Sequence, residues 1–163
     1  MTFEETLAKE GVLIYTTTGV SMRPLLRQRL DVVEIRPKGP GRCKKYDVVL
    51  YKHGGRYVLH RILKVRKRDY VIAGDHNIWR EYGITDDQIL GVLTRIIRDG
   101  KTITPDHFLY RLYIHLWVDF FPIRAAILYG RRLIHALPRK LKRILTGGRA
   151  ESAGRRKNGA GSE

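Results

Sequence analysis

Residues 46–65 read YDVVLYKHGGRYVLHRILKV, two apolar runs rich in Val and Ile on either side of His53, Gly54 and Gly55. β-branched and aromatic residues favour strands, and a Gly-Gly pair between two such runs is typical of a tight hairpin turn. The second run, residues 56–65, is long enough to cross a whole sheet. This stretch therefore predicts an antiparallel β-hairpin.

Further strands are predicted on both sides of this hairpin. VLIYTT (12–17) and DVVEI (31–35) precede it, and VRKRDYVIAG (65–74) makes a second hairpin with charged turn residues. QILGVLTRIIRDGKTITP (88–105) adds a strand pair around an Asp-Gly turn. Because helical periodicity is almost missing from this part of the chain, residues 12–104 are predicted to form a mainly β domain.

The N-terminal segment, residues 1–11, is predicted to be a short helix. Thr2 offers an N-cap, Glu5 lies three positions later as in a capping box, and Gly11 ends the helix. The segment is acidic and amphipathic, whereas a secretory signal begins with positive charge followed by an uninterrupted apolar stretch. We therefore expect no cleaved export signal.

The C-terminal part changes character. Residues 105–145 repeat apolar side chains at helical spacing, and Pro122 and Pro138 interrupt the run, so two or three basic amphipathic helices are expected. Residues 146–163 are rich in Gly, Ser and charge and are predicted to be disordered.

The apolar residues of this helical extension allow two interpretations. They pack against the β domain or a partner, or residues 108–143 form an anchor on an anionic membrane surface. The second interpretation rests on the basic residues that accompany the aromatics, Arg124, Arg131, Arg132, Arg139, Lys140, Lys142 and Arg143. A transmembrane span is less favoured, because Arg111, His115, Asp119 and Arg124 interrupt every window of the required length, about 20 residues.

Composition limits the class of protein. The chain has 163 residues, enough for one domain with its own core, and 32 Lys and Arg against 16 Asp and Glu, a net charge of +16. Such a charge favours an anionic partner, nucleic acid or a lipid surface. The single cysteine, Cys43, cannot form an internal disulfide, and no His/Cys spacing suggests zinc. We expect a cytoplasmic location, peripheral to a membrane if the helices bind one.

Residues 16–26, TTTGVSMRPLL, place one serine, Ser21, in a polar turn between two apolar runs. A serine hydroxyl is a weak nucleophile unless a neighbouring base takes its proton. His60 lies in the middle of a predicted strand, where the sheet would fix its position. Ser21 and His60 are therefore candidates for a nucleophile and its general base.

Five segments in order resemble the catalytic domain of type I signal peptidases and the related LexA-like serine peptidases. They are GVSMRP, KKYDVVLYK, YVLHRILKV, VIAGDHN and ILGVLTRI, and the resemblance covers roughly residues 12–97. It implies a signal-peptidase/LexA-like β-fold with a helical C-terminal extension, and a serine endopeptidase that needs neither metal nor organic cofactor.

The resemblance also implies roles for individual residues. Ser21 takes the place of the nucleophile, and His60 the place where most bacterial members carry lysine, as in the endoplasmic-reticulum and archaeal type. Asp75 is the first choice for the acid that orients His60. Glu81 is the reserve, since it aligns with an aspartate of the histidine-type enzymes. Asp87 lies farther along and is more typical of a strand entry.

The turn around the serine has its own implied roles. In the relatives, the oxyanion is bound mainly by the backbone amide at the nucleophile, helped by the residue two positions before it, which is Gly19 here. Met22 and Pro24 complete the serine motif and are expected to shape the turn. Backbone donors aimed at a developing negative charge contribute a few kcal/mol to catalysis.

The expected activity is cleavage of an extended leader or signal-type peptide, bound as an added strand beside Ser21, with small side chains before the cut. Two alternatives remain open: a LexA-like regulatory module that cleaves itself, and a non-catalytic protein that binds peptide or lipid. Nucleic acid is the less favoured partner, and the sequence does not indicate an oligomeric state.

Overall fold

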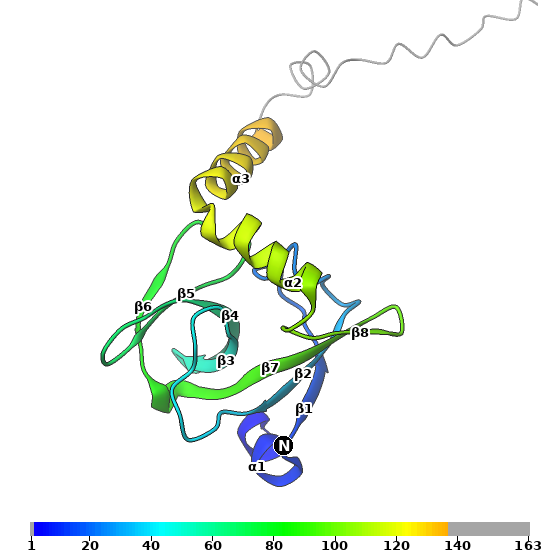
Figure 1. The fold of residues 1–163 in the computed structure, drawn as a ribbon, viewed down its shortest axis with the longest axis vertical. Helices are drawn as coiled ribbons and strands as arrows, with labels where there is room; N and C mark the ends of the chain where they lie inside the picture. The colour runs from blue at the N-terminus through cyan, green and yellow to red at the C-terminus, as the bar shows by residue number, and fades with distance from the viewer. Residues whose placement is uncertain (1, 137–163) are drawn as a thin grey trace, which may run out of the picture. The chain divides into compact units, whose positions relative to one another are not determined.

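The computed structural model describes residues 2–136 and confirms a mainly β protein with short helices and a C-terminal helix (Figure 1). The chain divides into two compact units, residues 1–128 and residues 129–163. The first unit contains the whole sheet and every residue discussed below as part of a site.

Eight strands form one antiparallel sheet. The order is β1-β2-β7-β3-β4-β5-β6, and β8 pairs with β7 outside this path. The strands are β1 (Leu13–Thr16), β2 (Val32–Pro37), β3 (Val48–His53), β4 (Arg56–Val65), β5 (Tyr70–Ala73), β6 (Glu81–Ile84), β7 (Ile89–Arg98) and β8 (Lys101–Ile103).

The predicted hairpins are present. β3 and β4 pair with Val49 opposite His60, and β4 continues into β5 through the charged turn. The Asp99-Gly100 turn joins β7 to β8. The strand that carries His60 is therefore held by neighbours on both sides, which fixes the imidazole within the sheet.

Apolar side chains are buried on both faces of the central strands. One core cluster joins Leu50 of β3 to helix α1 (Phe3–Glu10), the serine turn and the first C-terminal helices, and the other contains Tyr51 and Ile62. Because both faces of β3 are covered, residues 48–51 are all buried, and the polar alternation of a half-exposed strand is missing.

The N-terminal helix agrees with its sequence signals. The Thr2 side chain accepts a hydrogen bond from the Glu5 backbone, Glu5 bonds back to the Thr2 N–H, and Gly11 adopts the left-handed conformation at the C-cap. Two further elements were not expected. β6 is a four-residue strand, and Asp86–Gln88 forms a single 3-10 turn, η1, before β7.

The helical extension begins with α2 (Phe108–Tyr113), continues as a π-helical segment, η2 (Ile114–Asp119), and is followed by α3 (Phe121–Ala136). The helical run is interrupted at Phe120, two residues before Pro122. Pro122 occupies the first turn of α3, where a missing backbone N–H costs little. Pro138, the end of the predicted extension at residue 145, and the tail 146–163 lie outside the described residues.

Between residues 2 and 136, no single helix has both the length and the apolar character needed to cross a membrane. Two helical segments separated by a bend, Phe108–Asp119 and Arg124–Gly130, meet those criteria only when taken together.

Candidate active site

The turn that carries Ser21 is fastened to the sheet. The Met22 side chain is buried in the first core cluster together with Leu26, while Ser21 remains partly exposed. The Ser21 carbonyl accepts a hydrogen bond of 2.7 Å from the backbone N–H of His76. The serine turn is therefore attached to the loop that follows β5, residues 74–77.

Gly74 marks the place where this turn meets the imidazole of His60. A methyl group built on Gly74 would lie 2.5 Å from the Ser21 carbonyl oxygen and 3.0 Å from His60 Nε2. The Ser21 carbonyl oxygen and His60 Nε2 are therefore separated by no more than the sum of these two distances from the methyl position. The Nε2 edge of the ring faces the serine turn across a glycine that leaves no room for a side chain.

The opposite ring nitrogen of His60 faces a carboxylate. Glu81 Oε1 lies 3.0 Å from Nδ1, and the Tyr51 hydroxyl lies 3.1 Å from the same nitrogen while donating a 2.7 Å hydrogen bond to Glu81 Oε2. Since Tyr51 gives its proton to Glu81, the network assigns the Nδ1 proton of the neutral ring to a bond with Glu81. Nε2 is then an acceptor on the serine side.

The surroundings of His60 keep it in the neutral form. Burial lowers the pKa of His60 below its usual value near 6.5, and the charge of Glu81 opposes this shift. Burial and the Glu81 carboxylate raise the pKa of Tyr51, so its hydroxyl stays protonated. A neutral imidazole with its acceptor nitrogen toward a serine is the state that a general base requires.

Asp75 is engaged elsewhere. Its carboxylate receives two hydrogen bonds from Arg61, 2.8 Å from Nε and 2.7 Å from Nη2, and one of 3.0 Å from the Tyr113 hydroxyl. The Trp117 indole N–H donates to the Asp75 carbonyl at 2.9 Å. Both charged side chains of the pair are fully buried. The geometry thus favours Glu81 over Asp75 as the acid that orients His60.

Two other residues of the serine motif, Gly19 and Pro24, lie at the surface. Gly19 is exposed, and a side chain there would meet no atom within 4 Å, so steric crowding does not require glycine at this position. Pro24 is also exposed and follows a cis peptide bond. Asp87 lies exposed in η1. Cys43 is buried, and burial raises the pKa of its thiol to about 11.

Three residues of this site were not singled out by the sequence: Tyr51, Arg61 and Gly74. Arg61 follows His60 directly in β4, and Gly74 directly precedes Asp75. A charged residue inside a strand of buried residues is the one signal that could have indicated a buried partner for Arg61. The pairing of Tyr51 with Glu81 has no sequence signal, because 30 residues separate them.

A groove of about 620 Å³ borders Ser21. It runs from α1 and β1 past the serine turn to the end of the β3–β4 hairpin, and its walls include Phe3, Tyr15, Met22 and Tyr57. β1 is an edge strand of the sheet, so its outer backbone groups can pair with an added extended chain.

No protein-family model matches the sequence, and no curated protein matches it significantly. Within residues 2–136, no group of three His, Cys, Asp or Glu side chains has the arrangement of a metal site. Around His60, the structure brings together the serine turn on the Nε2 side and the Glu81 carboxylate on the Nδ1 side.

Replacing Asp75 tests its assignment as a structural partner. Asp75→Asn leaves the buried Arg61 charge without a carboxylate, and we expect a loss of about 3–5 kcal/mol in the free energy of unfolding. Chemical denaturation measures it, with Asp87→Asn as the matched control at an exposed carboxylate. A loss in Asp75→Asn no larger than that of the control would contradict this role.

The contact at Gly74 gives a second prediction. Gly74→Ala forces the serine turn away from His60, because the new methyl group meets backbone oxygen, and overpacking of this kind costs about 1–3 kcal/mol. Thermal unfolding measures the loss. Gly39→Ala is the control, since a side chain there meets no atom within 4 Å. Equal melting temperatures for the two variants would contradict the crowding.

Proposed function

We propose that this protein is a serine endopeptidase with a signal-peptidase/LexA-like fold, in which Ser21 is the nucleophile, His60 the general base and Glu81 the acid that orients it. The observation that carries the proposal is the placement of the His60 ring. Its Nδ1 atom bonds to Glu81, and its Nε2 atom faces the Ser21 turn across Gly74. The resemblance of the surrounding segments to that superfamily supports it independently.

The chemistry follows from this arrangement. The Ser21 oxygen attacks the carbonyl carbon of the scissile peptide bond, and its proton passes to His60 Nε2. Glu81 stabilises the imidazolium through the Nδ1 proton. The imidazolium then protonates the departing amine, which leaves an ester on Ser21. Water, deprotonated by the same imidazole, hydrolyses this ester and restores the serine.

The negative charge on the tetrahedral intermediate needs hydrogen-bond donors. As the resemblance implies, the backbone N–H of Ser21 supplies one such donor, helped by the residue two positions before it, Gly19. Preorganised donors of this kind are worth roughly 10²–10³ in rate. The attachment of the turn through Met22 and the His76 N–H keeps such donors in place, because the turn cannot shift without breaking those contacts.

The groove beside Ser21 indicates the form of the substrate. A peptide that pairs with the outer edge of β1 would be extended, so alternate side chains would point into the groove. Met22, Leu50 and Leu59 are buried apolar residues of the groove lining, which suits small uncharged side chains before the cut. This substrate agrees with the preference that the resemblance implies.

Loss of either reacting group should abolish turnover. Ser21→Ala and His60→Ala are expected to lower kcat/KM for leader peptides with small residues before the cut by roughly a thousandfold or more. Thr102→Ala and His53→Ala remove the same chemical groups from exposed positions outside the groove and serve as controls. Similar turnover in all five proteins, wild type included, would remove the proposal.

The dependence on pH tests Glu81. Since neutral His60 is the active base and burial lowers its pKa, activity should rise with pH through an inflection below about 6.5. Glu81 opposes that lowering, so Glu81→Gln should move the inflection to still lower pH and reduce kcat roughly a hundredfold or more.

Asp87→Asn is the control for this profile, because its carboxylate is exposed in η1. Full pH profiles of kcat/KM for wild type and both variants provide the measurement. If the inflection stays in place in Glu81→Gln, Glu81 is not the partner of the base. Mass spectrometry of the same samples separates cleavage of added peptide from cleavage of the chain itself.

A further inference from the structure

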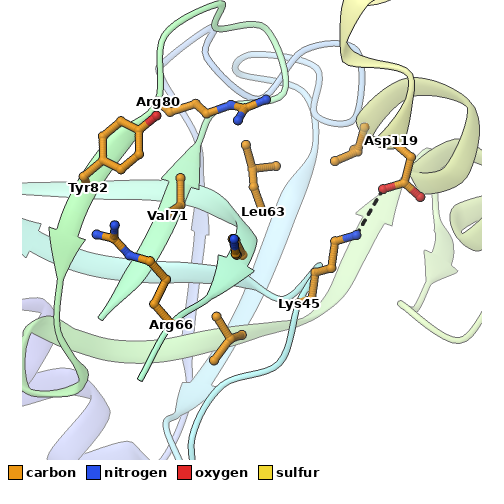
Figure 2. Close-up of a pocket in the computed structure, with 10 residues that line it drawn as sticks. Lys45, Leu63, Arg66, Val71, Arg80, Tyr82 and Asp119 are labelled. Carbon is orange, nitrogen blue, oxygen red and sulfur yellow. Dashed lines mark hydrogen bonds and ion pairs between the residues drawn. The ribbon is translucent and has the colours of Figure 1, made fainter. Parts of the chain in front are cut away.

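A second cavity, of about 720 Å³, lies between β4, β5, the start of β6 and η2. Figure 2 shows Arg66 and Arg80 near Tyr82 on one side of it, and Lys45 beside Asp119 on the other. Its lining includes four cationic residues, Lys45, Lys64, Arg66 and Arg80, against one carboxylate, that of Asp119.

Cationic residues outnumber carboxylates in and around this basic pocket. Lys45 lies 3.3 Å from Asp119, and Arg66 pairs with Asp69 in the turn after β4. The same turn adds the exposed residues Lys67 and Arg68. Cations thus exceed carboxylates around the cavity. Guanidinium groups bind phosphate through paired N–H donors, so the chemistry of the pocket suits a phosphate group.

Exposed apolar side chains accompany the basic pocket. In α2 and η2, one stripe of residues, Tyr110, Ile114 and Val118, is buried against the sheet. Another stripe, spaced by four residues, faces outward with exposed fractions of 72%, 41%, 60% and 53% for Phe108, Leu112, Leu116 and Phe120. This helical segment is apolar on its outer face as well as on its buried face, and an exposed apolar surface of this kind is typical of a site that contacts a membrane or another protein.

Residues of the apolar stripe are sequence neighbours of residues that line the basic pocket. Val118 and Asp119 line the pocket, and Leu116 and Phe120 of the stripe flank them in the chain. Trp79, which directly precedes the lining residue Arg80, is 65% exposed. Tryptophan and leucine beside lysine and arginine is the composition of surfaces that lie in the interface of a bilayer.

We propose that the basic pocket binds the phosphate headgroup of an anionic phospholipid, while the outward stripe and Trp79 enter the surface of the bilayer. A soluble phosphate would use the pocket but not the stripe. The inference goes beyond the peptidase proposal and does not depend on it, because no residue of the pocket is a reacting group.

This surface shares its apolar stripe with the anchor predicted from the sequence but differs in its cations. Arg124, one of the basic residues expected to face the membrane, is 1% exposed and donates a 3.1 Å hydrogen bond to the Asn77 carbonyl. Its charge is therefore turned toward the loop beside the serine. The cations assigned here come instead from the β-sheet and the loops next to it.

Binding to vesicles tests the proposal. The full chain should bind vesicles of phosphatidylglycerol and phosphatidylcholine, and the double variant Lys64→Gln/Arg80→Gln should bind about tenfold more weakly or worse, because each cation at such a surface contributes measurably. Lys9→Gln/Lys101→Gln removes the same charge from exposed positions outside the pocket and should lose less than about threefold.

An equal loss in both double variants would mean diffuse attraction by net charge and would overturn the pocket. Titration with inorganic phosphate and with a short DNA duplex distinguishes binding of these anions from binding of the lipid. The lipid proposal is overturned if wild type does not bind the vesicles but does bind phosphate or DNA, and if that binding depends on Lys64 and Arg80. Ser21→Ala should bind vesicles like wild type, so failure of the peptidase proposal leaves this result unchanged.

Tryptophan fluorescence gives a measurement that needs no charge variant. Brominated lipid in the vesicles should quench the emission of the unmodified chain, because Trp79 is one of only two tryptophans and is mostly exposed. Most of that quenching should disappear in Trp79→Phe. Quenching that is missing from wild type, or that persists fully in Trp79→Phe, would contradict insertion of this surface.

Discussion

The buried ion pair between Arg61 and Asp75 connects the parts of the structure on which the site depends. Arg61 directly follows His60 in β4, and Asp75 directly follows Gly74, where the serine turn meets the imidazole. The helical extension attaches to the same pair through Tyr113 and Trp117. Two charges withdrawn from water are stable only with complete hydrogen bonding, so this requirement holds strand, loop and helices in one arrangement.

The alternation of side chains along a strand explains how one segment serves two purposes. His60 and its neighbour Arg61 point to opposite faces of β4. On one face His60 meets Tyr51 and Glu81, and on the other Arg61 meets Asp75 and the tyrosines of α2. The proposed base thus shares its backbone with the ion pair that stabilises the fold.

The start of β6 links the two proposed sites in a similar way. Glu81 bonds to His60, whereas Arg80 and Tyr82 on either side of it line the basic pocket. A phosphate bound in that pocket would therefore lie next to the short strand that carries the proposed catalytic acid. The proposed acid and two lining residues of the proposed phosphate pocket are thus consecutive in the chain.

The sequence by itself determined the strands that surround His60, the capped first helix and the two candidates Ser21 and His60, because local propensity, turn residues and motif order are written along the chain. It did not determine which acid meets the imidazole. That choice depends on pairings between distant strands, including a register shift between β5 and β6, and on the capture of Asp75 by Arg61. Only the tertiary structure could decide it, since hydrogen-bond partners are selected by the side chains that face one another after the sheet has formed.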